Sequence, residues 1–183
     1  RATDMAGHRT SLGHFLTRSE WDEVGVLTQV AMATLKRMKP VQGEELCLII
    51  DDTRIAKRGR QFEAISKMWD HAHQKFVYGH MVVTAAVLFR GVVLPWRLIL
   101  WLPKDFAGSA YRKTTEIAAD MIREFAPPCG LKVRVLFDAF YLCGPVTKAC
   151  ESRGFSWFSV ASKNRKLKRK GAGKSGQLAD IAP

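Results

Sequence analysis

The chain has 183 residues, 47% of them hydrophobic, and a formal net charge of +12 at pH 7. This length is enough for one globular domain with a buried core and gives no reason to expect two. The longest apolar stretch, residues 81–102, is interrupted by Arg90, Pro95 and Arg97, which excludes a membrane-spanning helix of about 20 residues. The positive charge indicates a polyanionic partner, either nucleic acid or an anionic membrane surface.

The ends of the sequence and its cysteines predict a fragment from a protein of a reducing compartment. The sequence opens on Arg1 without a charged-then-apolar leader and stops at Pro183, so we expect a fragment of a longer protein. The four cysteines lack both the paired spacing of zinc sites and the density of a disulfide scaffold. Buried thiols in a reducing compartment, the cytoplasm, are the simplest interpretation.

A helix is expected within the first forty residues. Ser19 is the predicted N-cap, with Asp22 in the first turn, and Pro40 and Gly43 end the helical pattern. The apolar side chains recur at helical spacing, which predicts one buried stripe; they are Trp21, Val24, Leu27, Val30, Ala31, Leu35 and Met38.

The next segments favour strands. Residues 46–50 (LCLII) form a continuous apolar run, as in a strand buried on both faces. Residues 79–89 and 92–102 flank the dipeptide Arg90-Gly91, which is the pattern of a β-hairpin. Pro95 predicts that the second strand of this hairpin lies at a sheet edge or contains a bulge.

The second half of the sequence alternates helix and strand. Residues 109–125 predict an amphipathic helix, 131–138 a strand, 142–152 a helix and 155–162 another strand. Strand-helix-strand units favour parallel neighbours joined by right-handed crossovers. We therefore predict an α/β fold in which helices cover a mixed sheet.

Two predicted strands end on acidic residues. Asp51 and Asp52 follow the run at 46–50, and Asp138 ends the strand at 131–138. If these strands are parallel neighbours, their carboxylates emerge at the same edge of the sheet. Carboxylates crowded in this way suit Mg²⁺ or Mn²⁺, and a pair of such ions promotes phosphodiester chemistry. The alternative is that each aspartate only forms a turn or caps a helix.

The basic residues fall into two clusters. A smaller cluster directly after Asp51 and Asp52 consists of Arg54, Lys57, Arg58 and Arg60. Residues 163–174 hold seven Lys and Arg residues and no acid. Each cluster alone is equally consistent with a solvated surface. Beside the carboxylates, they are candidates for holding DNA phosphates; these candidates are Lys57, Arg58, Arg60, Lys163, Arg165, Lys166, Lys168, Arg169 and Lys170.

Two blocks of the sequence resemble a known family. Residues 48–80, LIIDDTRIAKRGRQFEAISKMWDHAHQKFVYGH, look like the first catalytic block of DDE-type bacterial insertion-sequence transposases, in the group named after insertion sequence four. The matching positions of that block are Asp51, Asp52, Thr53, Lys57 and Gly59. Residues 133–166, VRVLFDAFYLCGPVTKACESRGFSWFSVASKNRK, are similar to the second block, at positions Asp138, Phe140 or Tyr141, and Gly154.

The resemblance implies a fold, a chemistry and a set of ligands. It implies an RNase H-like core at 44–162, a helical segment at 1–43, and a basic linker or the start of an inserted subdomain at 163–183. Asp51 and Asp138 would be catalytic metal ligands for two Mg²⁺ or Mn²⁺ ions, and Asp52 would have a supporting role. The family's third acid, a glutamate on a later helix, has no counterpart before Pro183. The chain alone is therefore expected to be inactive.

The expected protein is a cytoplasmic, DNA-associated transposase that cuts and joins mobile-element ends, with DNA as its partner and a homodimer in the complex of paired ends. A catalytically inactive DNA-binding remnant would use the same fold and basic surface, and the missing glutamate favours it. Another RNase H-like nuclease, such as a junction resolvase, is the third interpretation.

Overall fold

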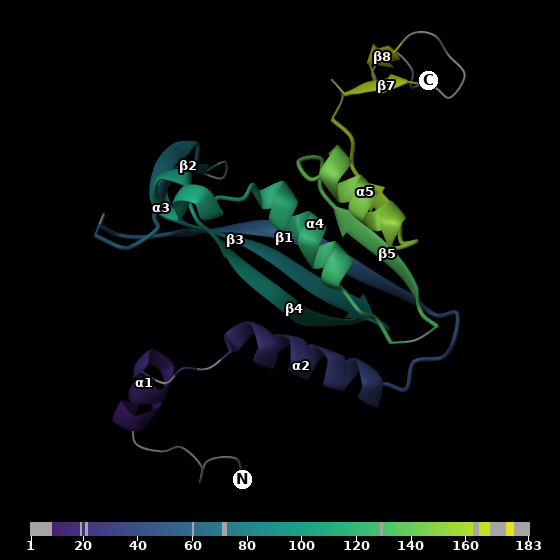
Figure 1. Ribbon diagram of the computed structural model, residues 1–183, viewed down its shortest axis with the longest axis horizontal. Helices are drawn as coiled ribbons and strands as arrows, with labels where there is room; N and C mark the ends of the chain where they lie inside the picture. The colour runs from purple at the N-terminus through teal and green to yellow at the C-terminus, as the bar shows by residue number, and fades with distance from the viewer. Residues whose placement is uncertain are drawn as a thin grey trace.

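The computed structural model describes residues 9–18, 20, 22–59, 61–70, 73–128, 130–162, 165–168 and 175–177. A six-stranded mixed sheet forms its centre, with helices α4 and α5 on one side and α2 on the other (Figure 1). The elements in chain order are α1 (Arg9–Arg18), α2 (Glu23–Arg37), β1 (Glu45–Ala56), β2 (Ser66–Asp70), β3 (Lys75–Phe89), β4 (Val92–Trp101), α3 (Lys104–Ala107), η1 (Gly108–Ala110), α4 (Thr114–Glu124), β5 (Lys132–Phe137), α5 (Gly144–Ser152), β6 (Ser156–Ser159), β7 (Lys166–Lys168) and β8 (Ser175–Gln177).

The strand order confirms the predicted fold class. The sheet runs β2-β3-β1-β5-β6, and β4 also pairs with β3. β1, β5 and β6 are parallel, whereas β3 is antiparallel to β1, β2 and β4. The path β4-β3-β1-β5-β6, with helices on its faces, is RNase H-like. The prediction that the two aspartate-bearing strands are parallel neighbours is confirmed as well.

The hairpin of β3 and β4 forms as predicted. Arg90 and Gly91 both have positive φ, 47° and 79°, which gives the two-residue turn that suits the twist of a hairpin. The register shifts between Ala85 and Ala86, where Pro95 lies on the opposite strand. Within the described residues β4 pairs only with β3, so Pro95 occupies a bulge in an edge strand.

Strand β1 is longer than predicted, and β2 was not predicted at all. β3 pairs with β1 from Cys47 to Ala56, so β1 continues six residues past its apolar run. A Cβ atom on Gly79 would lie 2.2 Å from the Ile55 carbonyl oxygen, so only glycine allows this close approach. In β2 only Met68 is buried, which left no alternating pattern to identify.

One face of the sheet carries the core. Leu46, Leu48 and Ile50 of β1 are fully buried and alternate with half-buried residues, as expected for a strand covered mainly on one side. Helix α4 buries Ile117, Ala118, Ala119, Met121 and Ile122 in the same cluster, and its amphipathic pattern follows from this packing.

Helix α2 packs on β4 from the other side of the sheet (Figure 1). It begins at Glu23, and Asp22 is its N-cap, because the Asp22 carboxylate accepts a 2.7 Å hydrogen bond from the Gly25 backbone N–H. The predicted cap, Ser19, lies outside the described residues. The Thr28 hydroxyl donates to the Trp96 carbonyl oxygen at 3.3 Å. None of the described helices is long and apolar enough to cross a membrane.

Leu48→Ala should destabilise the fold by about 2–5 kcal/mol, since it empties a fully buried site at the centre of β1. Val41→Ala, in the exposed loop before β1, is the control and should change the free energy of unfolding by less than about 0.5 kcal/mol. Urea denaturation followed by circular dichroism measures both. Equal effects of the two substitutions would contradict the assigned core.

Candidate functional site

Two acidic residues lie where neighbouring strands separate. The parallel pairing of β1 and β5 ends at Ile50 opposite Phe137, and the next residues are Asp51 and Asp138. Both side chains are exposed and line one open pocket of about 370 Å³. The full lining is Asp51, Asp52, Arg54, Met81, Asp138 and Phe140. The structure therefore brings the two predicted site residues together.

The position of Asp51 and Asp52 in the strand corrects one expectation. They were expected to follow the strand, but both lie within β1, which stays paired with β3. Successive residues of a strand point to opposite faces. Asp51 is exposed, whereas the Asp52 side chain is only 13% exposed. The pairing with β3 thus gives two adjacent carboxylates different surroundings.

The surroundings of Asp52 shift the pKa of its carboxyl. Desolvation raises the pKa of its carboxyl, and the negative charges of Asp51 and Asp138 raise it further. The Arg54 guanidinium, 3.5 Å from the Asp52 carboxylate, opposes this rise. The three carboxylates are therefore close enough to repel one another.

Tyr141 lies beneath these acids and is fully buried. Burial raises the pKa of its phenol, and the charges of Asp52, Asp51 and Asp138 add to the rise, so the hydroxyl stays protonated. The hydroxyl lies near Asp52 and Thr114, but within the described residues it makes no hydrogen bond of ordinary geometry. A neutral phenol at this place adds no further negative charge to the acidic pocket.

Asp138 also shapes its own turn. Its Oδ1 accepts hydrogen bonds from the backbone N–H groups of Phe140 and Tyr141, at 3.0 and 3.2 Å. The Ser159 hydroxyl donates to the Asp138 carbonyl oxygen at 3.0 Å, which ties the turn to β6. The turn-forming interpretation of this residue is therefore correct as to local geometry. It does not exclude metal binding, because a carboxylate has two oxygens.

The two carboxylates suit a hard cation. Mg²⁺ in proteins is commonly held by one or two carboxylates, with water and phosphate oxygens completing the octahedron. Asp51 and Asp138 provide that many donors around one open pocket. Among the described residues there is no group of three or more His, Cys, Asp or Glu side chains placed to hold a metal ion. The residues thus fit a site that is completed by further ligands.

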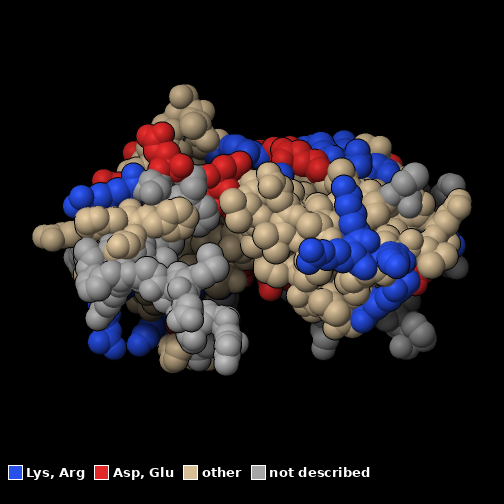
Figure 2. All heavy atoms as spheres, turned by 90° about the horizontal axis from the view of Figure 1, so that it is seen from below, with Lys and Arg blue, Asp and Glu red and all other residues tan. Residues whose placement is uncertain are grey.

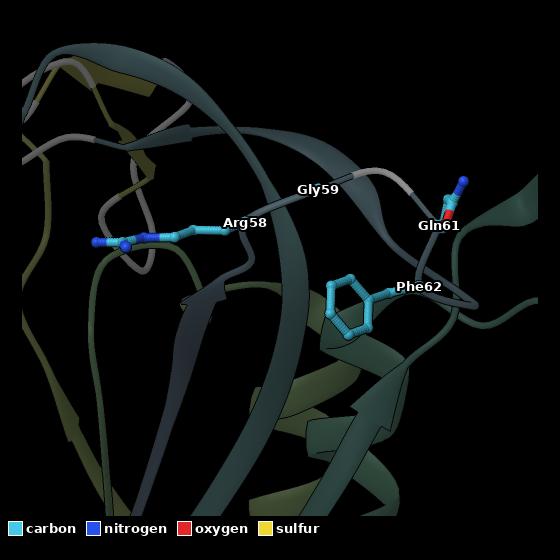
Figure 3. A pocket seen from close by; sticks show the side chains of 4 residues that line it. All are labelled: Arg58, Gly59, Gln61 and Phe62. Carbon is cyan, nitrogen blue, oxygen red and sulfur yellow. The ribbon is translucent and has the colours of Figure 1, made fainter.

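The first basic cluster begins beyond the end of β1, which stays extended from Asp51 to Ala56. The Lys57 ammonium is 5.6 Å from the centre of the Phe62 ring, and Arg58 is exposed. Arg58, Gly59, Gln61 and Phe62 line an open hollow of about 690 Å³. Figure 3 shows the Arg58 side chain extending to the left and the Gln61 side chain pointing upward, with the Phe62 ring between their positions. Gly59 has a φ of 103°, a conformation that L side chains rarely adopt.

Arg54 is the basic residue inside the acidic pocket, and it was not among the predicted phosphate-binding residues. The signal that would have identified it is the strand period of two. Arg54 shares a face of β1 with Asp52, whereas Lys57 and Arg58 lie beyond the end of the strand.

The second basic cluster lies largely outside the described residues. Among the predicted phosphate contacts, Arg60, Lys163, Arg169 and Lys170 are outside them. Lys166 and Lys168 belong to β7, but their side chains lie outside the described part of the structure. Arg165 is half-buried, and its backbone N–H donates to the Ser162 carbonyl oxygen at 3.0 Å.

The charged side chains of the described residues do not form one continuous basic face on the α2 side. Figure 2, which looks from that side, shows groups of Lys and Arg with Asp and Glu between them. Support for an anionic ligand therefore comes from Arg54 in the acidic pocket and from the hollow beside Arg58, not from an evenly basic surface.

Known proteins resemble this chain over most of its length. The DDE superfamily endonuclease family matches residues 1–176. A protein of Microchaete diplosiphon, "Probable transposase for insertion sequence element IS701", is 31% identical over 137 residues. That match covers 73% of this chain and 35% of the relative, so the chain spans about a third of the relative's length. Endonucleases of this superfamily generally use divalent metal ions.

Asp52→Asn should stabilise the protein at neutral pH. The native state holds the Asp52 proton more tightly than the unfolded chain does, so ionisation of this carboxyl costs stability above its raised pKa. The cost vanishes below the ordinary pKa of aspartate, about 4, where both states are protonated. Urea unfolding at several pH values should show the variant's advantage shrinking as the pH falls. A constant advantage, or one that grows in acid, would contradict the assignment.

Proposed function

This chain belongs to the DDE superfamily endonucleases, and we propose that it forms part of the catalytic domain of a transposase that cuts and joins DNA at the ends of its own mobile element. One observation carries the proposal. Asp51 and Asp138 lie on neighbouring parallel strands and face one pocket at the point where those strands separate. The similarity to an insertion-sequence transposase supports the same conclusion.

In this proposal, Asp51 and Asp138 hold Mg²⁺ or Mn²⁺, with two ions in the complete site. Bound divalent ions supply activation of a water or 3′-hydroxyl and stabilisation of the leaving oxygen. The turn at Asp138 fixes one of its oxygens, so that the other points to a constant place. Arg54 lines the same pocket and provides positive charge for a phosphate oxygen.

A third acid from beyond this sequence would complete the site, so the chain alone is expected to be inactive. Within the active protein, residues 44–162 are the catalytic core, 1–43 a helical segment, and 163–183 a basic linker or the start of an inserted subdomain. DNA is held by Lys57, Arg58 and Arg60 and by the basic residues of 163–170. The whole protein would act in the bacterial cytoplasm as a homodimer on paired ends. It would belong to the group named after insertion sequence four.

A second candidate is a DNA-binding remnant without catalysis. The pocket has only two exposed carboxylates, and the described residues contain no group of three potential metal ligands, which is the observation in its favour. The two candidates share the fold and the basic residues. They differ in whether the longer protein cleaves DNA.

Asp51→Asn or Asp138→Asn should each abolish Mg²⁺- or Mn²⁺-dependent cleavage by the longer protein, because an amide neither carries the charge nor binds a hard cation as well. Glu151→Gln is the control, since Glu151 is an exposed acid on α5 away from the pocket, and its activity should match the wild type. Cleavage of labelled element ends measures all three. Full activity in either aspartate variant would refute its role as ligand.

No cleavage by the wild-type protein with either ion would instead favour the remnant. Cleavage of branched DNA without any requirement for element ends would favour a resolvase.

DNA binding by this chain should weaken steeply with salt, since we attribute it to phosphate contacts. If six phosphates are neutralised, raising the salt from 50 to 200 mM should lower the affinity roughly a thousandfold. Fluorescence anisotropy with a labelled duplex in EDTA measures this without cleavage. An affinity that does not depend on salt would rule out the basic clusters as the binding surface.

A further inference from the structure

An exposed cluster of aromatic and lysine side chains lies on the ribbon formed by β2 and the start of β3. The Trp69 and Phe76 rings meet edge to face, with centroids 5.0 Å apart. The Lys67 ammonium lies 4.5 Å from the centre of the Phe76 ring. Trp69 is 40% exposed and Phe76 59% exposed, so these rings contribute little to the core. We call Lys67, Trp69 and Phe76 the ribbon patch.

The ribbon patch lies on the same face of the sheet as Asp51. Asp51 pairs with Thr84 of β3, and residues of even number from Thr84 to Phe76 share that face. Phe76 pairs with Trp69, and Lys67 is two residues from Trp69 on the same strand. The strand pairing therefore places the Asp51 side chain and the patch on one face of the sheet, whereas Arg54 and Met81 of the acidic pocket lie on the opposite face.

The spacing along this surface suits a duplex. Eight residues of β3 separate Thr84 from Phe76, which corresponds to roughly 26 Å at about 3.3 Å per residue. That length matches about eight base pairs at 3.4 Å each. In Figure 1 the ribbon lies to the left of β5 and α5, whereas β7 and β8 lie above α5. The patch is thus separate from β7 and β8.

The excess of basic side chains around this part of the sequence indicates an anionic partner for the patch. The described residues between 53 and 80 include five Lys and Arg side chains and two acids. One of these acids, Asp70, already pairs with His73 at 2.8 Å. An ammonium held over a ring, on a segment whose basic side chains outnumber its acids, favours a polyanion over a protein surface. Half-exposed aromatic rings beside it can pack on sugars and base edges.

We propose that the ribbon patch is a second DNA contact, which binds the flank of a duplex about eight base pairs from the phosphate at Asp51 and Asp138. Lys67, oriented by the Phe76 ring, binds a backbone phosphate of that flank. Trp69 and Phe76 pack against the groove beside it. This inference rests on the proposed function, because the acids define the position of the cut.

The test is DNA binding by this chain in EDTA, measured by fluorescence anisotropy with duplexes of 8 and 24 base pairs. On the long duplex, Lys67→Ala should reduce the slope of log affinity against log salt by about one. Trp69→Ala should weaken binding to the long duplex roughly threefold to tenfold, and Trp69→Phe should restore most of it. On the short duplex, which cannot span both sites, the effects should be less than about twofold.

Lys132→Ala is the matched control. Lys132 is an exposed lysine at the amino end of β5, at the opposite edge of the sheet from the acids. The patch is refuted if Lys132→Ala lowers the salt slope as much as Lys67→Ala, or if the Lys67 and Trp69 variants bind the long duplex like the wild type. Thermal melts of each variant show whether the ribbon remains folded, and Lys67→Ala leaves every ring in place.

The binding measurement is independent of cleavage. If the patch variants bind DNA like the wild type while the longer protein cleaves DNA, only this inference is overturned. Inactivity of the wild-type longer protein, with weakened binding by the patch variants, would overturn only the catalytic proposal.

Discussion

The site depends on strand β1 belonging to two ladders that end at different places. Its parallel ladder with β5 stops at Ile50, whereas its antiparallel ladder with β3 continues to Ala56. The sheet therefore opens on one side of Asp51 while its other side remains held. Asp138 turns away from β5 at the same level, and its turn is fixed by backbone N–H groups and Ser159. Two carboxylates thus face each other across a gap defined by backbone pairing.

That arrangement also separates the roles of adjacent acids. Both acids line the pocket, but side chains alternate along a strand, so Asp51 is exposed whereas Asp52 is largely buried near Tyr141. Burial makes ionisation of Asp52 unfavourable, and each neighbouring carboxylate adds to the penalty. A divalent cation would relieve the repulsion between the exposed pair, so the stability of this edge and its chemistry have the same electrostatic origin.

Those parts of the fold whose signal is local were predictable from the sequence. The run at 46–50, the turn at Arg90-Gly91 and the amphipathic stripe of α4 each reflect burial or backbone conformation within a few residues. The extension of β1 and the whole of β2 arise from pairing with β3, which is distant in sequence and leaves their side chains largely exposed. Asp138 was predictable as a residue that ends a strand. Its position in a pocket with Met81 was not predictable, because Met81 is distant from it in sequence.

The extended ribbon has a physical cost that the core does not offset. Ordering the backbone costs about 1–2 kcal/mol per residue, and β2 buries only Met68 in return. Burial of apolar surface stabilises a fold, so stability alone does not explain why the Trp69 and Phe76 rings are half-exposed. Since β3 pairs with β1 beside Asp51 and with β2 beside Trp69, one continuous strand holds both places at a fixed separation. A duplex lying along that strand would be positioned at the acids by its contact with the ribbon, which accounts for keeping an ordered segment that adds so little to the core.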